Sequence, residues 1–289
     1  MPPPIFADLG RHCAALFNNG YPLGLLKVDT NIKTCGNVNL NTGFGIKQED
    51  WSMGSAELNT KCTLNPPRIK TSVFESWDLD NNLKLGIVCE DLASYVPGIR
   101  LAGHGSLNPD TGLFSGKVNA QAKHNYTSVD VTYEGGDDKP HTVQGSLVAG
   151  LAGWLIGYKT NYDINEGQMT TPTLALGFCQ PTYQIHAFWD NWESYRLNMY
   201  HRINDRVEAG VLTTWKPGNP PPPPGEKGES AGIGKPASET GNNIAVGCRM
   251  LLTPSTFLRA KIDIDSQVGL GIESKIREGT TLTLATNID

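Results

Sequence analysis

The chain has 289 residues and a formal net charge of −5; only 18% of its residues are charged and 38% are hydrophobic. This balance argues against nucleic acid as a partner, because neutralising phosphates needs a basic face. The six cysteines include no CxxC pair, which argues against a zinc site or a disulfide framework and favours a reducing compartment.

The longest apolar run, residues 147–158, contains three glycines and is shorter than the roughly 20 residues that a transmembrane helix needs. This excludes a helical membrane protein. The sequence is still compatible with a membrane β-barrel, because the strands of such a barrel are segments of about 10 alternating residues with a weak hydropathy signal.

The first predicted element is a short amphipathic helix over residues 8–18. Leu9, Cys13 and Leu16 recur at spacings near 3.6, so they share one apolar stripe that we expect to be buried. The polar residues of this helix are Asp8, Arg11 and His12.

From residue 25 onward, apolar and polar residues alternate with a period of two, which is typical of strands with one apolar and one polar face. In residues 54–64, for example, Leu58 and Leu64 share one parity and Glu57 and Lys61 share the other. Turn signals such as NPP and NPDTG recur between these runs. The pattern predicts an up-and-down all-β meander of roughly 18 strands without a second helix.

A meander with this many strands fits a closed barrel better than a propeller, because no blade repeat of about 40 to 50 residues occurs. A barrel of this size is too wide for side chains to fill. Its inside is therefore wet, and its apolar face meets lipid. The charges predicted to line the pore include Lys27, Asp29, Lys33, Lys61 and Lys261.

Residues 216–243 interrupt the alternation with many prolines and glycines, including five consecutive prolines at 220–224. Such residues cannot join a sheet ladder, so they predict a long exposed loop with a polyproline stretch. The loop is either a docking segment for a proline-recognising partner or a tolerated insertion in a hairpin, and the second interpretation is favoured.

Several segments resemble, in the same order, the animal voltage-dependent anion channels, which are the eukaryotic porins of the mitochondrial outer membrane. They are FADLGRHCAALFNNGYPLGLLKVD (6–29), VFESWDLDNNL (73–83), LNPDTG (107–112), GWLIGYKTNYD (153–163), YHRINDRVEAGVLTTW (200–215) and GLGIESKIREGTTLTLA (269–285).

This resemblance implies a nineteen-stranded barrel over residues 25–289, with the helix of the N-terminal segment 1–24 inside the pore. It also implies passive passage of small ions and metabolites, including adenine nucleotides, without a cofactor. Ala14, Ala15 and Asn19 stand where the family usually carries charged residues. We therefore expect the preference for anions to be weak or reversed.

Glu75 is the residue that departs most clearly from the alternation, because its parity is that of Val73 and Trp77. It matches a membrane-facing glutamate of the family that is linked to gating and to hexokinase docking. A hexokinase-like partner, or a second copy of the chain, is therefore a predicted partner beside membrane lipid. The other interpretation is a bulge or register slip that turns Glu75 inward.

The closure of the barrel departs from the family, whose members continue into one more strand, whereas the resemblance here runs to Ala285 and the sequence to Asp289. An open edge in hydrocarbon leaves unpaired amides and carbonyls. We therefore predict that residues 280–288 pair antiparallel with residues 25–34, which gives about 18 strands.

The function predicted from these features is a passive diffusion channel of the mitochondrial outer membrane, possessing no catalytic constellation and no metal ligands at suitable spacing. The alternative is a conductance-poor paralogue that acts as a docking scaffold. An import-translocase barrel is a weaker third interpretation, since the N-terminal match points away from it.

Overall fold

The computed structural model describes the chain except for residues 1, 20, 22–24, 35–37, 48–52, 65–69, 79–80, 91–97, 138, 217–241, 265–266 and 289. The helices are η1 Phe6–Asp8 and α1 Arg11–Asn18, and the strands are β1 Leu25–Thr34, β2 Val38–Lys47, β3 Met53–Leu64, β4 Lys70–Asp78, β5 Leu83–Glu90, β6 Ile99–Leu107, β7 Phe114–Lys123, β8 Thr127–Gly136, β9 Thr142–Leu151, β10 Trp154–Asp163, β11 Gln168–Cys179, β12 Tyr183–Asp190, β13 Ser194–Arg202, β14 Val207–Trp215, β15 Asn243–Thr253, β16 Thr256–Asp263, β17 Val268–Arg277 and β18 Thr280–Ile288.

The described strands form one closed antiparallel barrel. Each strand pairs with its neighbours in sequence, and β1 also pairs with β18, in the register Val28 with Leu282 and Thr30 with Thr280. An even number of strands in a meander makes the first and last strands antiparallel. The predicted pairing of residues 280–288 with residues 25–34 is therefore confirmed, and the nineteen strands implied by the resemblance are corrected to 18.

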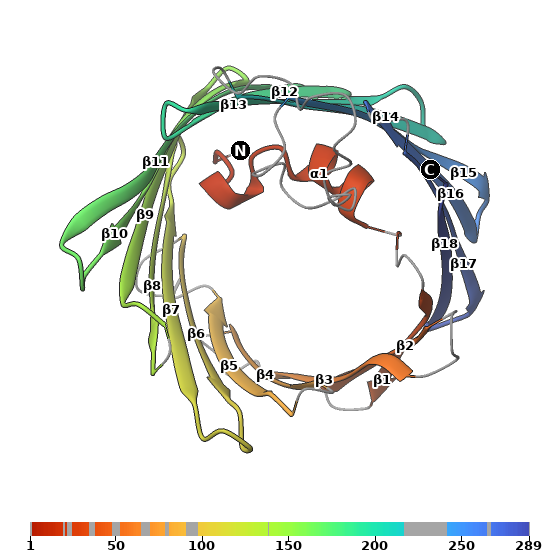
Figure 1. Ribbon diagram of the computed structural model, residues 1–289, viewed down its shortest axis with the longest axis horizontal. Coiled ribbons are helices and arrows are strands. Elements are labelled where there is room, and N and C mark those ends of the chain that lie inside the picture. The colour runs from red at the N-terminus through yellow and green to blue at the C-terminus, as the bar shows by residue number, and fades with distance from the viewer. Residues whose placement is uncertain are drawn as a thin grey trace, which may run out of the picture.

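The N-terminal helices lie inside the ring of strands, with η1 against β9 and β10 and α1 against β13, β14 and β15 (Figure 1). The predicted helix over residues 8–18 is wrong in one respect, because Gly10 lies between η1 and α1. Gly10 adopts a left-handed conformation with φ of 72°, which favours glycine and ends the first helix before the second begins.

The inner face of the barrel can be identified from the contacts of the N-terminal segment. The Ser128 hydroxyl on β8 shares its proton between the carbonyl oxygens of Pro3 and Pro4, at 2.9 and 2.8 Å, inside the ring. Glu134, six positions along the same strand, therefore also points inward. Cross-strand partners share a face, which extends this assignment to every strand through the register.

Large apolar side chains cover the outer face, and aromatic residues gather near both rims. Trp154 packs against Phe178 at the rim where β10 begins, with ring centroids 4.8 Å apart. At the opposite rim Tyr195 packs against Trp215, with centroids 5.3 Å apart. Aromatic girdles on either side of an apolar band are typical of membrane barrels. No helix in the described part of the chain is long and apolar enough to cross a membrane.

Candidate functional site: the pore and its docked helix

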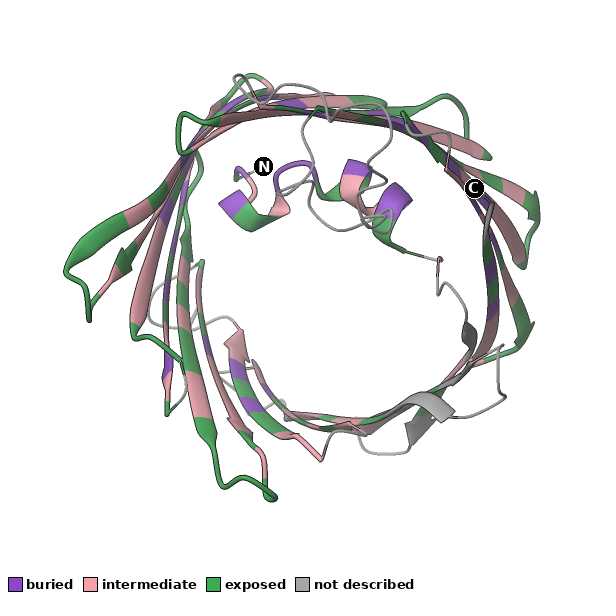
Figure 2. Cartoon of the chain, in the orientation of Figure 1, coloured by how far each residue is buried: buried purple, intermediate pink, exposed green. Residues whose placement is uncertain are grey.

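The apolar side of the N-terminal segment packs on the barrel wall in two places. Phe6 and Leu9 join a cluster with Val148, Leu155 and other buried residues of β9 to β12. Further along the chain, α1 contributes a second group, whose buried members are Cys13, Leu16, Phe17, Tyr200 and Ala245. Figure 2 shows buried segments in both helices. The predicted stripe is thus buried against the wall.

Inward-facing glycines let the helices approach the wall closely. A side chain at Gly210 would place its Cβ 2.8 Å from Leu16 Cδ1, and one at Gly247 would come within 3.0 Å of the Phe17 ring. Contacts this short force the neighbour to move. The alternation of apolar and polar residues predicted strands here but gave no sign of what covers these glycines.

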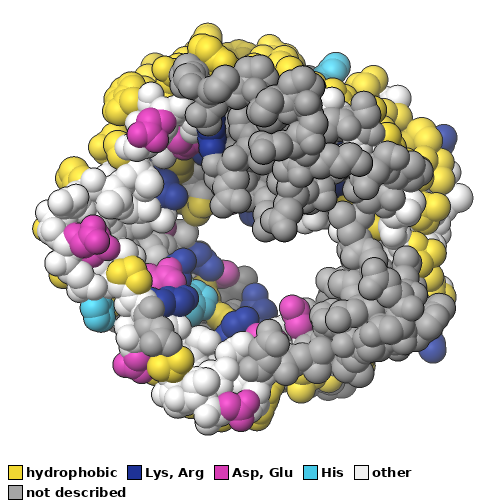
Figure 3. Space-filling model, in the orientation of Figure 1, with side chains coloured by type: hydrophobic (Ala, Val, Ile, Leu, Met, Phe, Trp, Pro, Cys, Tyr) yellow, Lys and Arg dark blue, Asp and Glu magenta, His cyan; other side chains and the backbone are white. Residues whose placement is uncertain are grey.

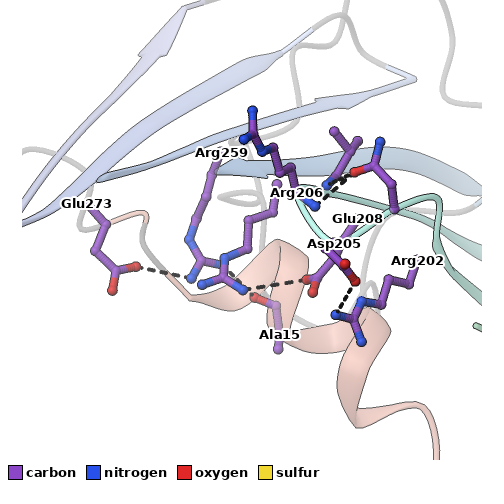
Figure 4. A network of polar contacts seen from close by, with 10 residues as sticks. Ala15, Arg202, Asp205, Arg206, Glu208, Arg259 and Glu273 are labelled. Carbon is purple, nitrogen blue, oxygen red and sulfur yellow. Dashed lines mark hydrogen bonds and ion pairs between the residues drawn. The ribbon is translucent and has the colours of Figure 1, made fainter. Parts of the chain in front are cut away.

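Two basic side chains of β16 bind the C-terminal end of α1. Lys261 Nζ donates to the carbonyl of Phe17 at 2.9 Å, and Arg259 Nη1 donates to the carbonyl of Ala15 at 3.5 Å. Arg259 also bonds Glu273 Oε2 at 3.1 Å (Figure 4). The last carbonyls of a helix lack partners within it and carry a partial negative charge, so cations are favoured there.

Lys261 also lies under an aromatic ring, with Nζ 4.1 Å from the centroid of Tyr21. Only 2% of this lysine is exposed. The expectation that Lys261 lines the open pore is therefore corrected: it points inward, but the N-terminal segment covers it. Its separation of 244 positions from Phe17 explains why the sequence pattern did not reveal the contact.

The polar residues predicted on the pore helix do not form one cluster. Arg11 is exposed and forms an ion pair with Asp8 at 3.2 Å. His12 lies within hydrogen-bond distance of the wall, with Nδ1 3.1 Å from Gln184 Oε1. The charges of Asp8 and Arg11 thus offset each other at the surface of the helix.

The predicted pore-lining charges lie on inward positions wherever the structure describes their side chains. Asp29 and Lys61 share the inner face of β1 and β3 through the register. Lys27 and Lys33 lie on β1 with the parity of Asp29, but their side chains are outside the described part of the structure. Figure 3 shows Lys, Arg, Asp, Glu and His side chains on the wall of the opening and hydrophobic ones around its outside.

Basic and acidic residues are almost equal in number among the inward positions whose side chains the structure describes, and Lys27, Lys33, Lys47 and Lys70 occupy further inward positions. The basic ones are Lys61, Lys84, Arg100, Lys117, Lys123, Lys159, Arg196, Arg202, Arg249, Arg259, Lys261 and Lys275, and the acidic ones are Asp29, Glu57, Asp78, Glu90, Asp130, Glu134, Asp163, Asp190, Glu208, Asp263 and Glu273. Many bond each other, as Lys117 does with Glu134 at 3.4 Å.

Glu75 lies on the outer face of β4. Its neighbour Phe74 belongs to a cross-strand row that runs through His104 and Lys117 to Glu134, and this row faces inward. Glu75 therefore points outward between Thr60 and Leu85, and no bulge interrupts the pairing of β4 on either side. Among the described strand residues it is the only Asp or Glu on an outward position.

The barrel, with its polar lining and apolar exterior, has the architecture of a porin, and comparison of its sequence with known proteins agrees with this. The sequence profile of the eukaryotic porin family matches residues 2–289. The chain belongs to the eukaryotic porin family. This porin is 29% identical to the voltage-dependent anion-selective channel of Drosophila melanogaster, an alignment that covers 100% of this chain and 93% of the relative.

Another relative is the non-selective voltage-gated ion channel VDAC2 of Xenopus laevis, which is 28% identical, with 99% of this chain and 93% of the relative covered. The fold is also similar to that of a solved mutant porin of Rh. blastica, with a TM-score of 0.50 and 5% identity over 91% of this chain and 99% of the other. That likeness concerns the fold alone.

Membership in this family makes the chain a passive pore of the mitochondrial outer membrane. The barrel is in contact with lipid, and small ions and metabolites pass through it. This confirms the predicted fold class, location and general function. Among the described residues, no group of three or more His, Cys, Asp or Glu is arranged to hold a metal ion.

Proposed function

We propose that this porin passes small ions and metabolites, adenine nucleotides among them, with weak selectivity for the sign of their charge. The observation that supports the proposal is the near balance of basic and acidic side chains on the described inner face. A pore prefers anions only when the field of its lining is positive. The ion pair of Asp8 with Arg11 adds no net charge on the helix.

Gating by voltage is part of the same proposal, because the relatives are named as voltage-dependent and voltage-gated channels. In this porin, α1 is bound to the wall by two cations at its C-terminal end. Closing transitions that need the helix to leave the wall would have to break these contacts.

Reconstitution into a planar bilayer tests the proposal. Reversal potentials in a potassium chloride gradient should lie near zero, and exchanging chloride for ATP in one chamber should leave a measurable nucleotide current. A strong chloride preference would contradict the weak selectivity, and a current that vanishes with ATP would contradict nucleotide passage.

A second candidate function, supported by Glu75, is docking of a partner at the membrane-facing wall. A lone outward carboxylate on an apolar face costs up to about 2 kcal/mol near mid-depth, and intramembrane charges commonly serve function. We propose that Glu75 takes part in gating or in contact with a hexokinase-like partner or a second copy. The loop 216–243, the other part of the scaffold interpretation, lies almost wholly outside the described residues.

The variant Glu75→Gln separates this role from a merely structural one. It should stabilise the barrel in lipid bilayers but not in detergent, while lowering partner binding or gating. Glu57→Gln, which changes an inward carboxylate, is the matched control. If Glu75→Gln destabilises the barrel in lipid, the carboxylate does not face the bilayer. Channels that stay silent yet still bind the partner would favour a scaffold over a pore.

A further inference from the structure

The meander sorts the turns of the barrel between its two mouths. Because neighbouring strands are antiparallel, turns after even-numbered strands lie at one mouth and turns after odd-numbered strands at the other. Charges in the turns and at the adjoining strand ends can therefore be assigned to a mouth from the topology alone.

Carboxylates concentrate at the mouth formed by the turns after even-numbered strands, which we call the acidic mouth. Its described turns carry four exposed carboxylates, Asp110, Asp137, Glu166 and Glu193. The basic residues there are Lys139 and Lys216, and Lys139 bonds Glu134 at 3.2 Å.

The strands that end at the acidic mouth add to its negative charge. Their charged terminal residues are Asp78 on β4, Asp163 on β10, Asp190 on β12 and Asp263 on β16, against the basic Lys47 on β2. Asp78 bonds Lys84 and Asp190 bonds Arg196, both a little deeper in the pore. The described part of this mouth is thus strongly negative.

The opposite mouth has a nearly balanced charge. Its described turns and strand ends carry Glu90, Asp205 and Glu278 together with Lys123, Arg202, Arg206 and Arg277. Arg202 and Asp205 form an ion pair at 2.9 Å. Among the side chains that the structure describes, the lining and one mouth are therefore nearly neutral, and the other mouth is negative.

We propose that this porin rectifies current, carrying more when the acidic mouth faces the positive side of the membrane. With this polarity, cations enter through the acidic mouth, which concentrates them. Anions enter from the opposite mouth and are repelled when they reach the acidic mouth, so both kinds of ion accumulate in the pore. In the reverse polarity both are depleted. The inference rests on the proposed passage of ions through the open pore.

Salt concentration sets the size of the effect. A few net charges about one Debye length from a passing ion change its local concentration roughly two- to fourfold at 0.1 M salt, where the Debye length is about 10 Å. At 1 M the Debye length falls to about 3 Å and the effect is screened. We expect the ratio of currents at opposite voltages to be about 1.5 at 0.1 M and about 1 at 1 M salt.

The test records instantaneous open-state currents of single channels at equal positive and negative voltages. The combined variant Asp110→Asn, Glu166→Gln and Glu193→Gln should bring the ratio at 0.1 M salt close to one. The matched control, Asp205→Asn with Glu278→Gln, makes the same chemical change at the opposite mouth and should preserve or increase the ratio.

The outcomes separate the two proposals. Channels that conduct but show a ratio of one at low salt overturn rectification alone, as do channels whose ratio survives neutralisation of the acidic mouth. If the ratio of currents at opposite voltages falls equally in the control variant, the effect comes from the overall charge of the protein, and this result also overturns the inference. Absence of any conductance overturns both rectification and the proposed passage of ions.

Discussion

Replacing Lys261 by methionine should release the N-terminal helix from the wall. The change roughly keeps the length of the aliphatic side chain. It removes the hydrogen bond to the Phe17 carbonyl at 2.9 Å and the contact with the Tyr21 ring at 4.1 Å. A hydrogen bond to a charged group contributes about 1.5–3 kcal/mol, and a cation–π contact about 0.5–2 kcal/mol.

The lower part of this combined range is the better expectation, because methionine also avoids the cost of burying a charge. A net loss of about 2 kcal/mol raises the population of the undocked helix about 30-fold, since each 1.36 kcal/mol is a factor of ten. An isolated helix as short as α1, of 8 residues, is unstable in water, so undocking should expose its amides to exchange.

Hydrogen exchange of the Ala14 amide, which bonds the Gly10 carbonyl at 3.0 Å, measures this population in lipid nanodiscs. Exchange in the Lys261→Met variant should be about 30-fold faster than in the wild type. Lys275→Met is the matched control, because Lys275 is exposed on the next strand, β17. Unchanged exchange in Lys261→Met, or an equal acceleration in the control, would refute the role of this lysine in docking.

Three further predictions concern closure, packing and pH. Cysteines placed at Val28 and Leu282 in a background without native cysteines should form a disulfide on oxidation, seen as a gel shift, because these residues are antiparallel partners; a reduced pair after oxidation would contradict the closure. Gly247→Val should weaken helix docking by about 1–3 kcal/mol in the same exchange assay, whereas Gly145→Val, with nothing within 4 Å of its added Cβ, should not. Burial raises the pKa of the Cys13 thiol from 9.0 to about 11. The docked state therefore holds the proton more tightly, so docking should be intact below pH 9 and should weaken by about 1.4 kcal/mol per pH unit as the pH rises from 9 toward 11. The mobility of a spin label on α1 measured from pH 8 to 10 checks this, and an identical pH profile in Cys13→Ala would count against it.

The strands and their faces were predictable because the side-chain period of a strand is local. The alternation in residues 54–64 predicted a strand with Leu58 and Glu57 on opposite faces, and β3 covers Met53–Leu64. The same local rule separated Glu75 from Phe74. Closure by residues 280–288 was also predictable, because hydrocarbon does not tolerate an unpaired edge.

The break in the N-terminal helix was not predicted, although Gly10 was visible in the sequence. A glycine within an amphipathic pattern is compatible with a continuous helix, at a cost of about 1 kcal/mol. The barrel wall leaves no room for a side chain at this position, because a Cβ at Gly10 would lie 2.7 Å from Asn198 Nδ2. This contact joins segments that are far apart in the chain. Local spacing carries no information about such a neighbour.

The sequence by itself determined the class of fold and the apolar stripe of the helix, and it favoured an outward Glu75, because each follows from the spacing of nearby residues along the chain. The uninterrupted pairing of β4 then excluded the alternative in which a bulge turns Glu75 inward. Only the tertiary structure decided that Lys261 is covered rather than open to the pore, since its partner Phe17 lies 244 positions away. It also gathered the carboxylates of separate turns at one mouth, because that arrangement depends on the direction in which each strand runs across the barrel.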